Sequence, residues 1–475
     1  MNKIYKLFID ENIKTWKKFS TKLAILFILI ALVGALGFVK LMQKMNENNF
    51  EIEDTYDWKE SVKTDISIYK ESLTNENLED DERKSLENQI RALELNLKYN
   101  INTSSNDWKN KVLNQISMSS SDIDEKLVEV VEKDDFSGWI ELQKEELKQQ
   151  LDQKQINQEQ YDNEIFILDL REKHEIGKTS TEEYEIDWRE NILSNIRTAK
   201  ESLRTGIDAQ TNKVLTTEQK EKYENEIKIG IYRIENNIKT LYNTDEDNYR
   251  MIFEVLASGF VVTMIAVFAI IVAGGTISNE ISTGTIKFWA LTPNKRWKIL
   301  TSKILSLLFY ILVITLIMAV LTVACANIFF DTDGNIYLYV KDGNVKIIGN
   351  TLFIIEYYLA KIIPVVIFAL FALMLSVITR NTSISLGLSA VVYMGNGIVM
   401  QILNLYIKKD WIKFVPFNNL NIADKIFPNF ENPMAMFGKS FATSTSLGFS
   451  LGVLGVCAIL MLVTMYDSFN KRDIV

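Results

Sequence analysis

The clearest group of residues that could do chemistry lies between two apolar segments, 252–274 and 304–330. Residues 280–303 read EISTGTIKFWALTPNKRWKILTSK. This segment carries one acid and five bases, namely Glu280, Lys287, Lys295, Arg296, Lys298 and Lys303. A charged segment between two membrane spans must face water, and an excess of Lys and Arg in a short loop predicts the cytoplasmic side.

An apolar cluster, followed by proline, lies within this loop. Its members are Ile286, Phe288, Trp289, Leu291 and the terminating Pro293. Proline ends a helical turn, so the pattern predicts a short amphipathic helix. Such a helix could dock on a cytoplasmic partner protein and transmit its motion. The alternative is an ordinary interfacial loop that is basic because it is cytoplasmic.

Residues suited to catalysis or metal binding are scarce. His174 is the sole histidine, and the two cysteines, Cys325 and Cys457, fall inside apolar segments. This composition argues against a His-pair metal site and a disulfide scaffold. The nearest match to a phosphate-binding loop is Gly438-Lys439-Ser440, but position 433 is proline where that motif needs glycine. We therefore expect no cofactor, no resident metal and no ATPase site in this chain.

Charge divides the chain into an acidic block and a basic frame. Residues 43–250 hold 48 Asp and Glu against 29 Lys and Arg, a net charge of −19, whereas the remainder has a net charge of +10. A basic, apolar frame suits the lipid bilayer and its cytoplasmic surface. The acidic block predicts no binding of nucleic acid.

Two motifs resemble the ABC-2 type transporter permeases, a family of membrane-spanning subunits. The loop has the family's spacing of an acid, Gly-Thr, proline and two bases, at Glu280, Gly284, Thr285, Pro293, Arg296 and Lys303. The end of the chain resembles the family's closing pattern, at Phe469, Lys471, Arg472 and Asp473. The resemblance covers residues 1–42 and 251–475, but not the middle.

The resemblance implies a function and partners. It implies that 286–291 acts as a coupling helix, docked into a groove on a separate cytoplasmic ABC ATPase subunit, which binds the ATP. Glu280 and Arg296 would fix the loop through polar contacts. A second permease copy or a related permease would complete the transport path, as a homodimer or a heterodimer.

Hydropathy predicts an all-α, polytopic membrane protein with six transmembrane helices. We expect an amphipathic helix at 1–22, the first span within 23–42, a helical extracytoplasmic domain at 43–250, and a transmembrane domain at 251–475 that contains the cytoplasmic loop 275–303. The resemblance implies that 1–22 is the family's elbow helix, that 275–303 is its coupling loop and that 404–445 is its outer re-entrant segment. The remaining spans are predicted at 252–274, 304–330, 357–378, 384–405 and 447–466. Both termini are expected in the cytoplasm of a cell-membrane protein. Glu254, Glu356 and Lys361 are expected near span ends, where they can reach the interface.

The acidic block contains a faint repeat. Asp-Trp-basic occurs at Trp58, Trp108 and Trp188, each followed by a β-branched residue and then isoleucine four positions later. This spacing places the apolar residues on one helix face. Each copy leads to a second helical stretch, at 90–101, 165–176 and 227–238. The pattern predicts three related helical hairpins, with chance similarity in a Lys-, Ile- and Asn-rich sequence as the alternative.

The leading interpretation is a permease subunit of an ATP-driven exporter of an amphiphile, peptide or antibiotic-like substrate. The chain itself would not be an enzyme. The alternative is a non-transporting membrane scaffold or sensor that displays the helical domain outside the cell.

Overall fold

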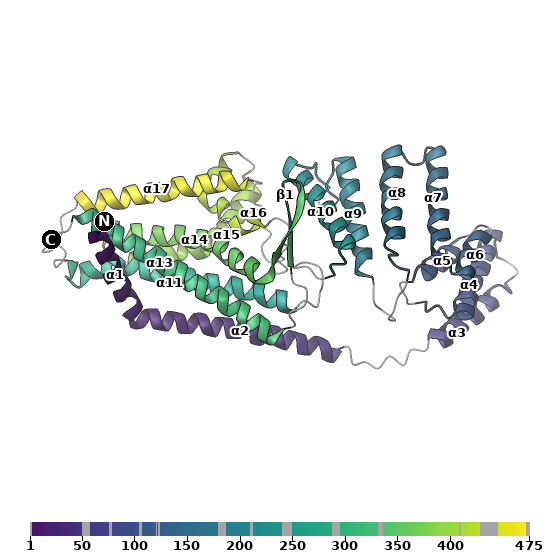
Figure 1. Cartoon of the computed structure of the whole chain (residues 1–475), viewed down its shortest axis with the longest axis horizontal. Coiled ribbons are helices and arrows are strands. Elements are labelled where there is room, and N and C mark those ends of the chain that lie inside the picture. Colours follow the sequence, from purple (N-terminus) through teal and green to yellow (C-terminus); the bar gives the residue numbers. More distant parts are fainter. Residues whose placement is uncertain are drawn as a thin grey trace. The chain divides into compact units, whose positions relative to one another are not determined.

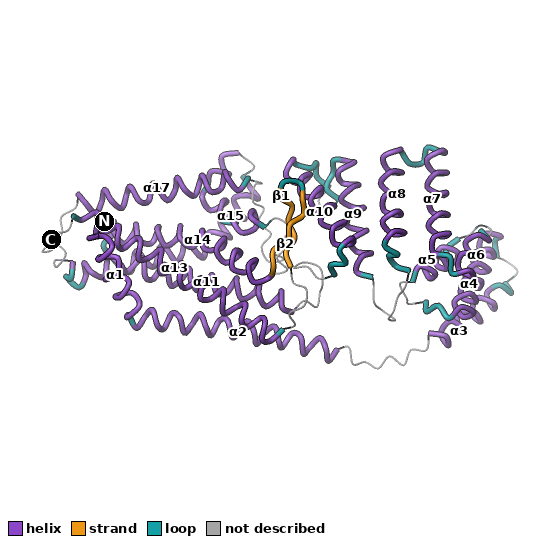
Figure 2. Tube along the Cα trace, viewed as in Figure 1, coloured by secondary structure: helices purple, strands orange, loops and turns teal. Residues whose placement is uncertain are grey.

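The protein is helical throughout most of its length. The computed structural model describes all residues except 1, 50–57, 76–77, 104–106, 120, 122–123, 179–186, 210–211, 240–248, 287–294, 331–335, 408–409, 428–444 and 472–475. Two strands, β1 (Ile336–Lys341) and β2 (Asn344–Gly349), pair in one small sheet (Figure 2). The chain divides into unit 1 (Met1–Phe50, Thr240–Tyr339 and Lys346–Val475) and unit 2 (Glu51–Lys239 and Val340–Val345).

Unit 1 is a bundle of long apolar helices (Figure 1). Among the described residues, six helices are long and apolar enough to cross a membrane: α2 (Phe19–Asn49), α11 (Tyr249–Ser282), α13 (Arg296–Phe329), α14 (Asn350–Thr379), α15 (Thr382–Tyr406) and α17 (Leu447–Lys471). A shorter helix, α1 (Asn2–Lys17), precedes them. The predicted all-α fold with six candidate spans is therefore confirmed.

Helix α11 forms the centre of this bundle. It packs against α2, α13, α14 and α15. Residues spaced four apart along it, Val261, Ile265, Ala269 and Ala273, are buried. Alanine and glycine let helices approach closely in an apolar environment. At Gly274 a Cβ atom would lie 2.6 Å from the Leu386 side chain, so α15 packs directly against the α11 backbone.

Several helices extend further than the sequence predicted. Helices reach into the predicted loop 275–303 from both ends, because α11 continues to Ser282 and α13 already begins at Arg296. Polar side chains between helices explain the extension. The Ser376 hydroxyl accepts a hydrogen bond from the Ser278 N–H at 3.0 Å, and the Thr382 hydroxyl donates one to the Ser278 hydroxyl at 2.9 Å. Packing between helices thus provides hydrogen-bond partners for polar residues that, in the sequence alone, would indicate the end of a helix.

The connection between α13 and α14 contains a β-hairpin formed by β1 and β2. Asp342 and Gly343 adopt φ of 52° and 79° between the two strands. Two consecutive residues with positive φ are typical of a tight turn that matches strand twist.

Beyond the end of α15 at Tyr406, the described part of the predicted re-entrant segment 404–445 contains only short helices. These are η1 (Asp410–Phe414), η2 (Pro416–Asn419) and α16 (Ile422–Ile426). The Phe427 ring anchors the segment, since its centroid lies 5.1 Å from that of Phe353 and 5.4 Å from that of Tyr337.

Unit 2 consists of consecutive helices that pack on their neighbours. They are α3 (Trp58–Ser72), α4 (Asp80–Tyr99), α5 (Trp108–Ser117), α6 (Glu125–Lys133), α7 (Phe136–Asp152), α8 (Gln158–Lys173), α9 (Trp188–Thr205) and α10 (Thr217–Glu235). The helix α2 reaches Asn49, so this unit begins several residues after the predicted position 43.

The Asp-Trp-basic motif marks helix starts in unit 2. Helices α3, α5 and α9 each begin at the tryptophan. The Asp107 carboxylate accepts a hydrogen bond from the Lys109 N–H, and Asp187 accepts one from the Arg189 N–H. Asp is a favoured N-cap because its oxygen satisfies an N–H that the helix leaves unpaired. In the two copies whose aspartate is described, the motif is therefore explained as a helix cap.

The second helical stretches at 90–101, 165–176 and 227–238 end in the same turn. The residue before the last isoleucine has positive φ in each, at Asn100, Glu175 and Asn237. The isoleucine N–H then donates to the carbonyl five residues earlier, at 2.9–3.0 Å. The side chain of that earlier residue donates a hydrogen bond to the isoleucine carbonyl, in the pairs Asn96–Ile101, Arg171–Ile176 and Arg233–Ile238. The three segments thus share both backbone and side-chain contacts.

Candidate functional site

Three helices of unit 1 meet where α1 lies against the end of α11 and the start of α13. The Lys303 ammonium on α13 lies 2.7 Å from the Glu280 carboxylate on α11 and 3.1 Å from the Glu11 carboxylate on α1. Lys14 adds a second cation, 3.2 Å from Glu11 and 3.7 Å from Glu280. These four residues are called the α1 ion-pair cluster below.

The α1 ion-pair cluster is largely shielded from solvent. The Lys303 side chain is 1% exposed and the Glu11 side chain is 8% exposed, whereas Lys14 is half-exposed. A buried charge is costly unless it is paired, and here two acids face two bases. The cluster therefore fixes the two ends of the α11–α13 connection to α1.

Burial and charge oppose each other at Glu11. Burial alone raises the pKa of its carboxyl, but the positive charges of Lys303 and Lys14 outweigh burial, so the pKa lies below its usual value. The carboxylate thus stays ionised at neutral pH. This state is the one that the ion pair with Lys303 requires.

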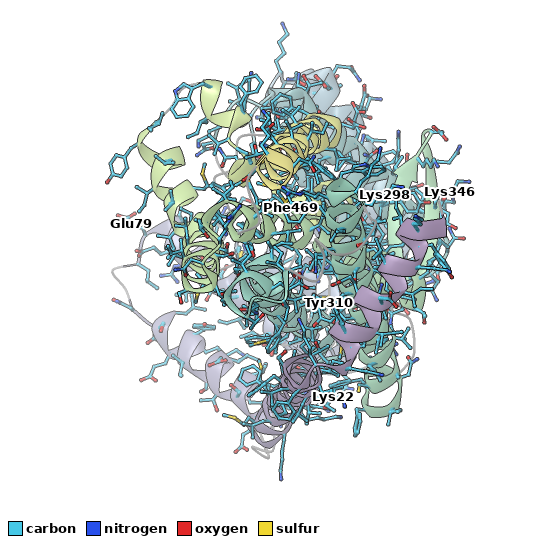
Figure 3. The ribbon with its side chains drawn as sticks, turned by 90° about the vertical axis from the view of Figure 1, so that its left-hand side faces the viewer. Lys22, Glu79, Lys298, Tyr310, Lys346 and Phe469 are labelled. Carbon is cyan, nitrogen blue, oxygen red and sulfur yellow. The ribbon has the colours of Figure 1, made fainter. Side chains whose placement is uncertain are left out.

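Apolar contacts hold α1 in position for the cluster. Leu7 is buried, and the Phe8 ring lies edge-on to Phe309 with centroids 5.6 Å apart. The Trp16 ring lies 5.5 Å from that of Tyr310, which sits inside the bundle (Figure 3). An amphipathic helix with basic and apolar faces suits the membrane interface. In this protein, its apolar residues also pack against α13.

The predicted site residues that the structure describes lie around the same connection. Gly284 has φ of 72°, a conformation that favours glycine and ends α11. The Thr285 hydroxyl donates to the Glu280 carbonyl at 3.3 Å, and Ile286 is buried. The other four predicted members, Phe288, Trp289, Leu291 and Pro293, lie outside the described residues.

Arg296 contacts another helix of the bundle. Its guanidinium donates to the Asn470 carbonyl near the end of α17 at 3.2 Å. The hydroxyls of Thr301 and Tyr466 are 2.7 Å apart and add a second contact between α13 and α17. The start of α13 is therefore fixed to α1 through Lys303 and to α17 through Arg296.

Sequence reasoning missed Glu11. It treated 1–22 only as an amphipathic elbow helix, although Asp10 and Glu11 are acids within it. The acid itself, on a helix otherwise rich in Lys, is the signal that could have revealed this site. If such an acid is buried, it needs a basic partner.

Glu254 and Lys361, which were predicted near span ends, both have partners within the bundle. Glu254 is fully buried, and its carboxylate lies 3.3 Å from the Arg250 guanidinium and 2.9 Å from the Asn350 amide. Helix α14 begins at Asn350, so Lys361 lies about three turns inside it. Its ammonium donates to the Ser258 hydroxyl at 2.9 Å.

Acidification offers a test of the α1 ion-pair cluster. A lowered pKa in the folded state means that Glu11 stabilises the packing of α1 at any pH above its ordinary value of about 4.5. This contribution is lost as the pH falls from there through the lowered pKa. We expect hydrogen exchange in α1 to stay slow from pH 7 to 5 and to accelerate below about 4.5, relative to the intrinsic rate. A Glu11→Gln variant should lack this step, and a step of equal size in that variant would contradict the assignment to Glu11.

No group of three or more His, Cys, Asp or Glu side chains that could hold a metal ion occurs within the described ranges. The role that the α1 ion-pair cluster can play is structural. It joins three helices by charge and leaves the α11–α13 connection as the point where a force could act.

Comparison with known proteins gives a family. Residues 232–475, slightly more than half of the chain, match the family model described as "Protein of unknown function (DUF2705)". The chain belongs to this family. The matched region contains α11, α13, α14, α15 and α17, which are five of the six candidate spans.

Two Bacillus subtilis (strain 168) proteins are similar to this DUF2705 protein. "Uncharacterized protein YhcI" is 29% identical over 262 residues, which cover 54% of this chain and 77% of that protein. "Uncharacterized membrane protein YdbK" is 27% identical over 211 residues, which cover 44% and 78%, respectively. No solved structure matches the chain significantly. The apolar helices and the membrane-protein relative together identify a multi-pass membrane protein.

Proposed function

We propose that this DUF2705 protein is the membrane-spanning permease subunit of an ABC-2 type exporter, driven by a separate ATPase subunit. One observation carries the proposal. The residues that match the permease loop motif surround a single helix connection, and two of them, Glu280 and Lys303, form an ion pair of 2.7 Å. The motif therefore has a physical role at the point where a permease would receive force.

The proposed orientation follows from charge. The α11–α13 connection and both termini lie in the cytoplasm, since Lys and Arg are concentrated there. Six spans return the chain to the same side, and unit 2 then lies outside the cell. The substrate is an amphiphile, a peptide or an antibiotic-like molecule.

In the proposed mechanism, ATP-driven closure of two ATPase subunits pushes on the segment 286–291. Helices α11 and α13 flank this segment and carry the movement into the bundle. The buried Lys303–Glu11 ion pair, at 3.1 Å, makes α1 move with them. A second permease copy or a related permease supplies the other half of the path, and access alternates between the halves.

Substitution in the connection tests the docking step. The double variant Phe288→Asp with Arg296→Glu places two acids where the proposal needs an apolar and a basic side chain. It should abolish copurification of the ATPase in mild detergent without reducing the amount of membrane-inserted protein. The matched control is Lys346→Glu with Ile347→Asp, which makes the same changes on exposed residues of β2. Normal copurification with the Phe288 and Arg296 variant would refute docking at this connection.

A further inference from the structure

The middle copy of the repeat in unit 2 is longer than the other two. Trp108 and Ile165 are 57 residues apart, whereas Trp58 and Ile90 are 32 apart and Trp188 and Ile227 are 39 apart. The additional length includes α6 and α7, which lie between α5 and α8 in the chain. Insertions in repeat proteins often lie on the face that binds a ligand.

A pocket of about 300 Å³ opens beside this insertion. Its wall is formed by the end of α5, the start of α6 and the face of α7. Amides and hydroxyls line one part, including Gln115, Ser119, Ser121 and Gln149. Ile116, Leu127 and Leu142 line another part and supply an apolar surface. The pocket thus offers both hydrogen-bonding groups and apolar contact.

The preceding copy holds the rim of the pocket in place. Asn88 on α4 is only 4% exposed, and its amide donates to the carbonyls of Ser119 and Ser121 at 2.8 and 2.9 Å. Asp124 caps α6 by accepting a hydrogen bond from the Lys126 N–H at 3.0 Å. A buried side-chain amide must be hydrogen-bonded, and the Asn88 amide is hydrogen-bonded only while both serine carbonyls stay in place. The fold therefore fixes the positions of Ser119 and Ser121.

The charge of the pocket is negative. Asp124, Glu145 and Glu146 contribute three carboxylates, and Lys126 contributes one ammonium. Lys126 lies 3.8 Å from Glu145, and both side chains are largely exposed, so this pair is weak. The surrounding acidic block has a net charge of −19, which raises the local concentration of cations.

We propose that this pocket binds a lysine or arginine side chain carried on a peptide. The carboxylates accept charge-assisted hydrogen bonds from its ammonium or guanidinium group. The apolar surface packs against its aliphatic stem, and the glutamine amides and serine hydroxyls pair with the peptide backbone. This inference goes beyond the transport role, since binding here needs neither an ATPase nor movement of the bundle.

Fluorescence anisotropy with a labelled peptide of alternating lysine and leucine tests the proposal on the full-length protein in detergent. The peptide should bind saturably, and the same peptide with acetylated lysines should bind at least tenfold more weakly. The variant Glu145→Gln with Glu146→Gln should weaken binding of the lysine peptide about tenfold. A control with the same loss of charge, Glu221→Gln with Glu224→Gln on exposed positions of α10, should change binding less than twofold.

A second variant keeps the test independent of the first. Gln149→Lys adds a cation at an exposed pocket position and should also weaken binding about tenfold. If the pocket variant and the α10 control weaken binding equally, the effect comes from the general acidity of the domain. That result would overturn the proposal. Absence of saturable binding would overturn it as well. Neither result would bear on ATPase copurification, so failure of the pocket and failure of the permease role remain distinguishable.

Discussion

Replacing Lys303 by methionine is expected to release α1 from the bundle. Lys303 is 1% exposed and is shared by Glu11 and Glu280, so its removal takes a cation from two shielded carboxylates at once. Breaking a buried ion pair on one side costs about 3–5 kcal/mol. Lys14 remains and offsets part of this cost, so we expect a loss near the lower limit, about 3 kcal/mol. A loss of this size accelerates hydrogen exchange in α1 about 100-fold.

Two variants make this prediction specific to the ion pair. Lys298→Met removes a more exposed lysine from the same helix, one that lies over the Trp297 ring, and should leave exchange in α1 nearly unchanged. Combining Glu11→Gln with Lys303→Met removes one of the stranded carboxylates and should recover part of the loss. Exchange in α1 that is as slow in Lys303→Met as in the unmodified protein would contradict a stabilising role for the cluster.

Replacing Arg171 by methionine should have a comparable effect in unit 2. The Arg171 guanidinium forms two hydrogen bonds with Glu190, at 2.5 and 2.7 Å, and joins the second copy of the repeat to the third. The charges of Arg171 and Lys111 outweigh burial and hold the pKa of Glu190 below its usual range. Lys111, 2.6 Å from Glu190, remains in the variant. We expect the free energy of unfolding of unit 2 to fall by about 3 kcal/mol.

An exposed ion pair of the same type provides the control. Arg197 pairs with Glu164 at 2.9 Å, but its side chain is 48% exposed, and pairs of this kind contribute about 0–1 kcal/mol. Arg197→Met should therefore change stability little. Hydrogen exchange in α8 and α9 of the full-length protein measures both variants. Similar losses of stability in Arg171→Met and Arg197→Met would contradict the prediction that burial makes the Arg171 ion pair the more stabilising one.

The sequence predicts the candidate spans well because each is a long uninterrupted apolar run. Their ends are predicted less well, since the polar residues there resemble a loop. Ser278 and Thr382 hydrogen-bond to one another across helices, and such contacts depend on packing that no local pattern reveals. The extension of α14 back to Asn350 similarly depends on partners such as Glu254.

The candidate site is only partly visible in the sequence. Glu280 and Lys303 are evident because they flank the connection, but Glu11 is almost 300 residues from Lys303 and belongs to a helix that looks merely interfacial. In unit 2 the tryptophan motif is evident. The turns that end at Ile101, Ile176 and Ile238 depend on positive φ at three different residue types, Asn100, Glu175 and Asn237. Only asparagine favours that conformation strongly, so the shared turn is hidden in the sequence.

The measurement that tests the permease role most directly is a mild-detergent pull-down of the tagged chain from its native membranes, with and without trapped nucleotide. The proposal predicts a stoichiometric ATPase with a phosphate-binding loop, and its loss in the Phe288→Asp, Arg296→Glu variant. A clean preparation that lacks any ATPase, even with nucleotide trapped, would contradict the permease role. It would favour a scaffold or sensor whose functional part is unit 2.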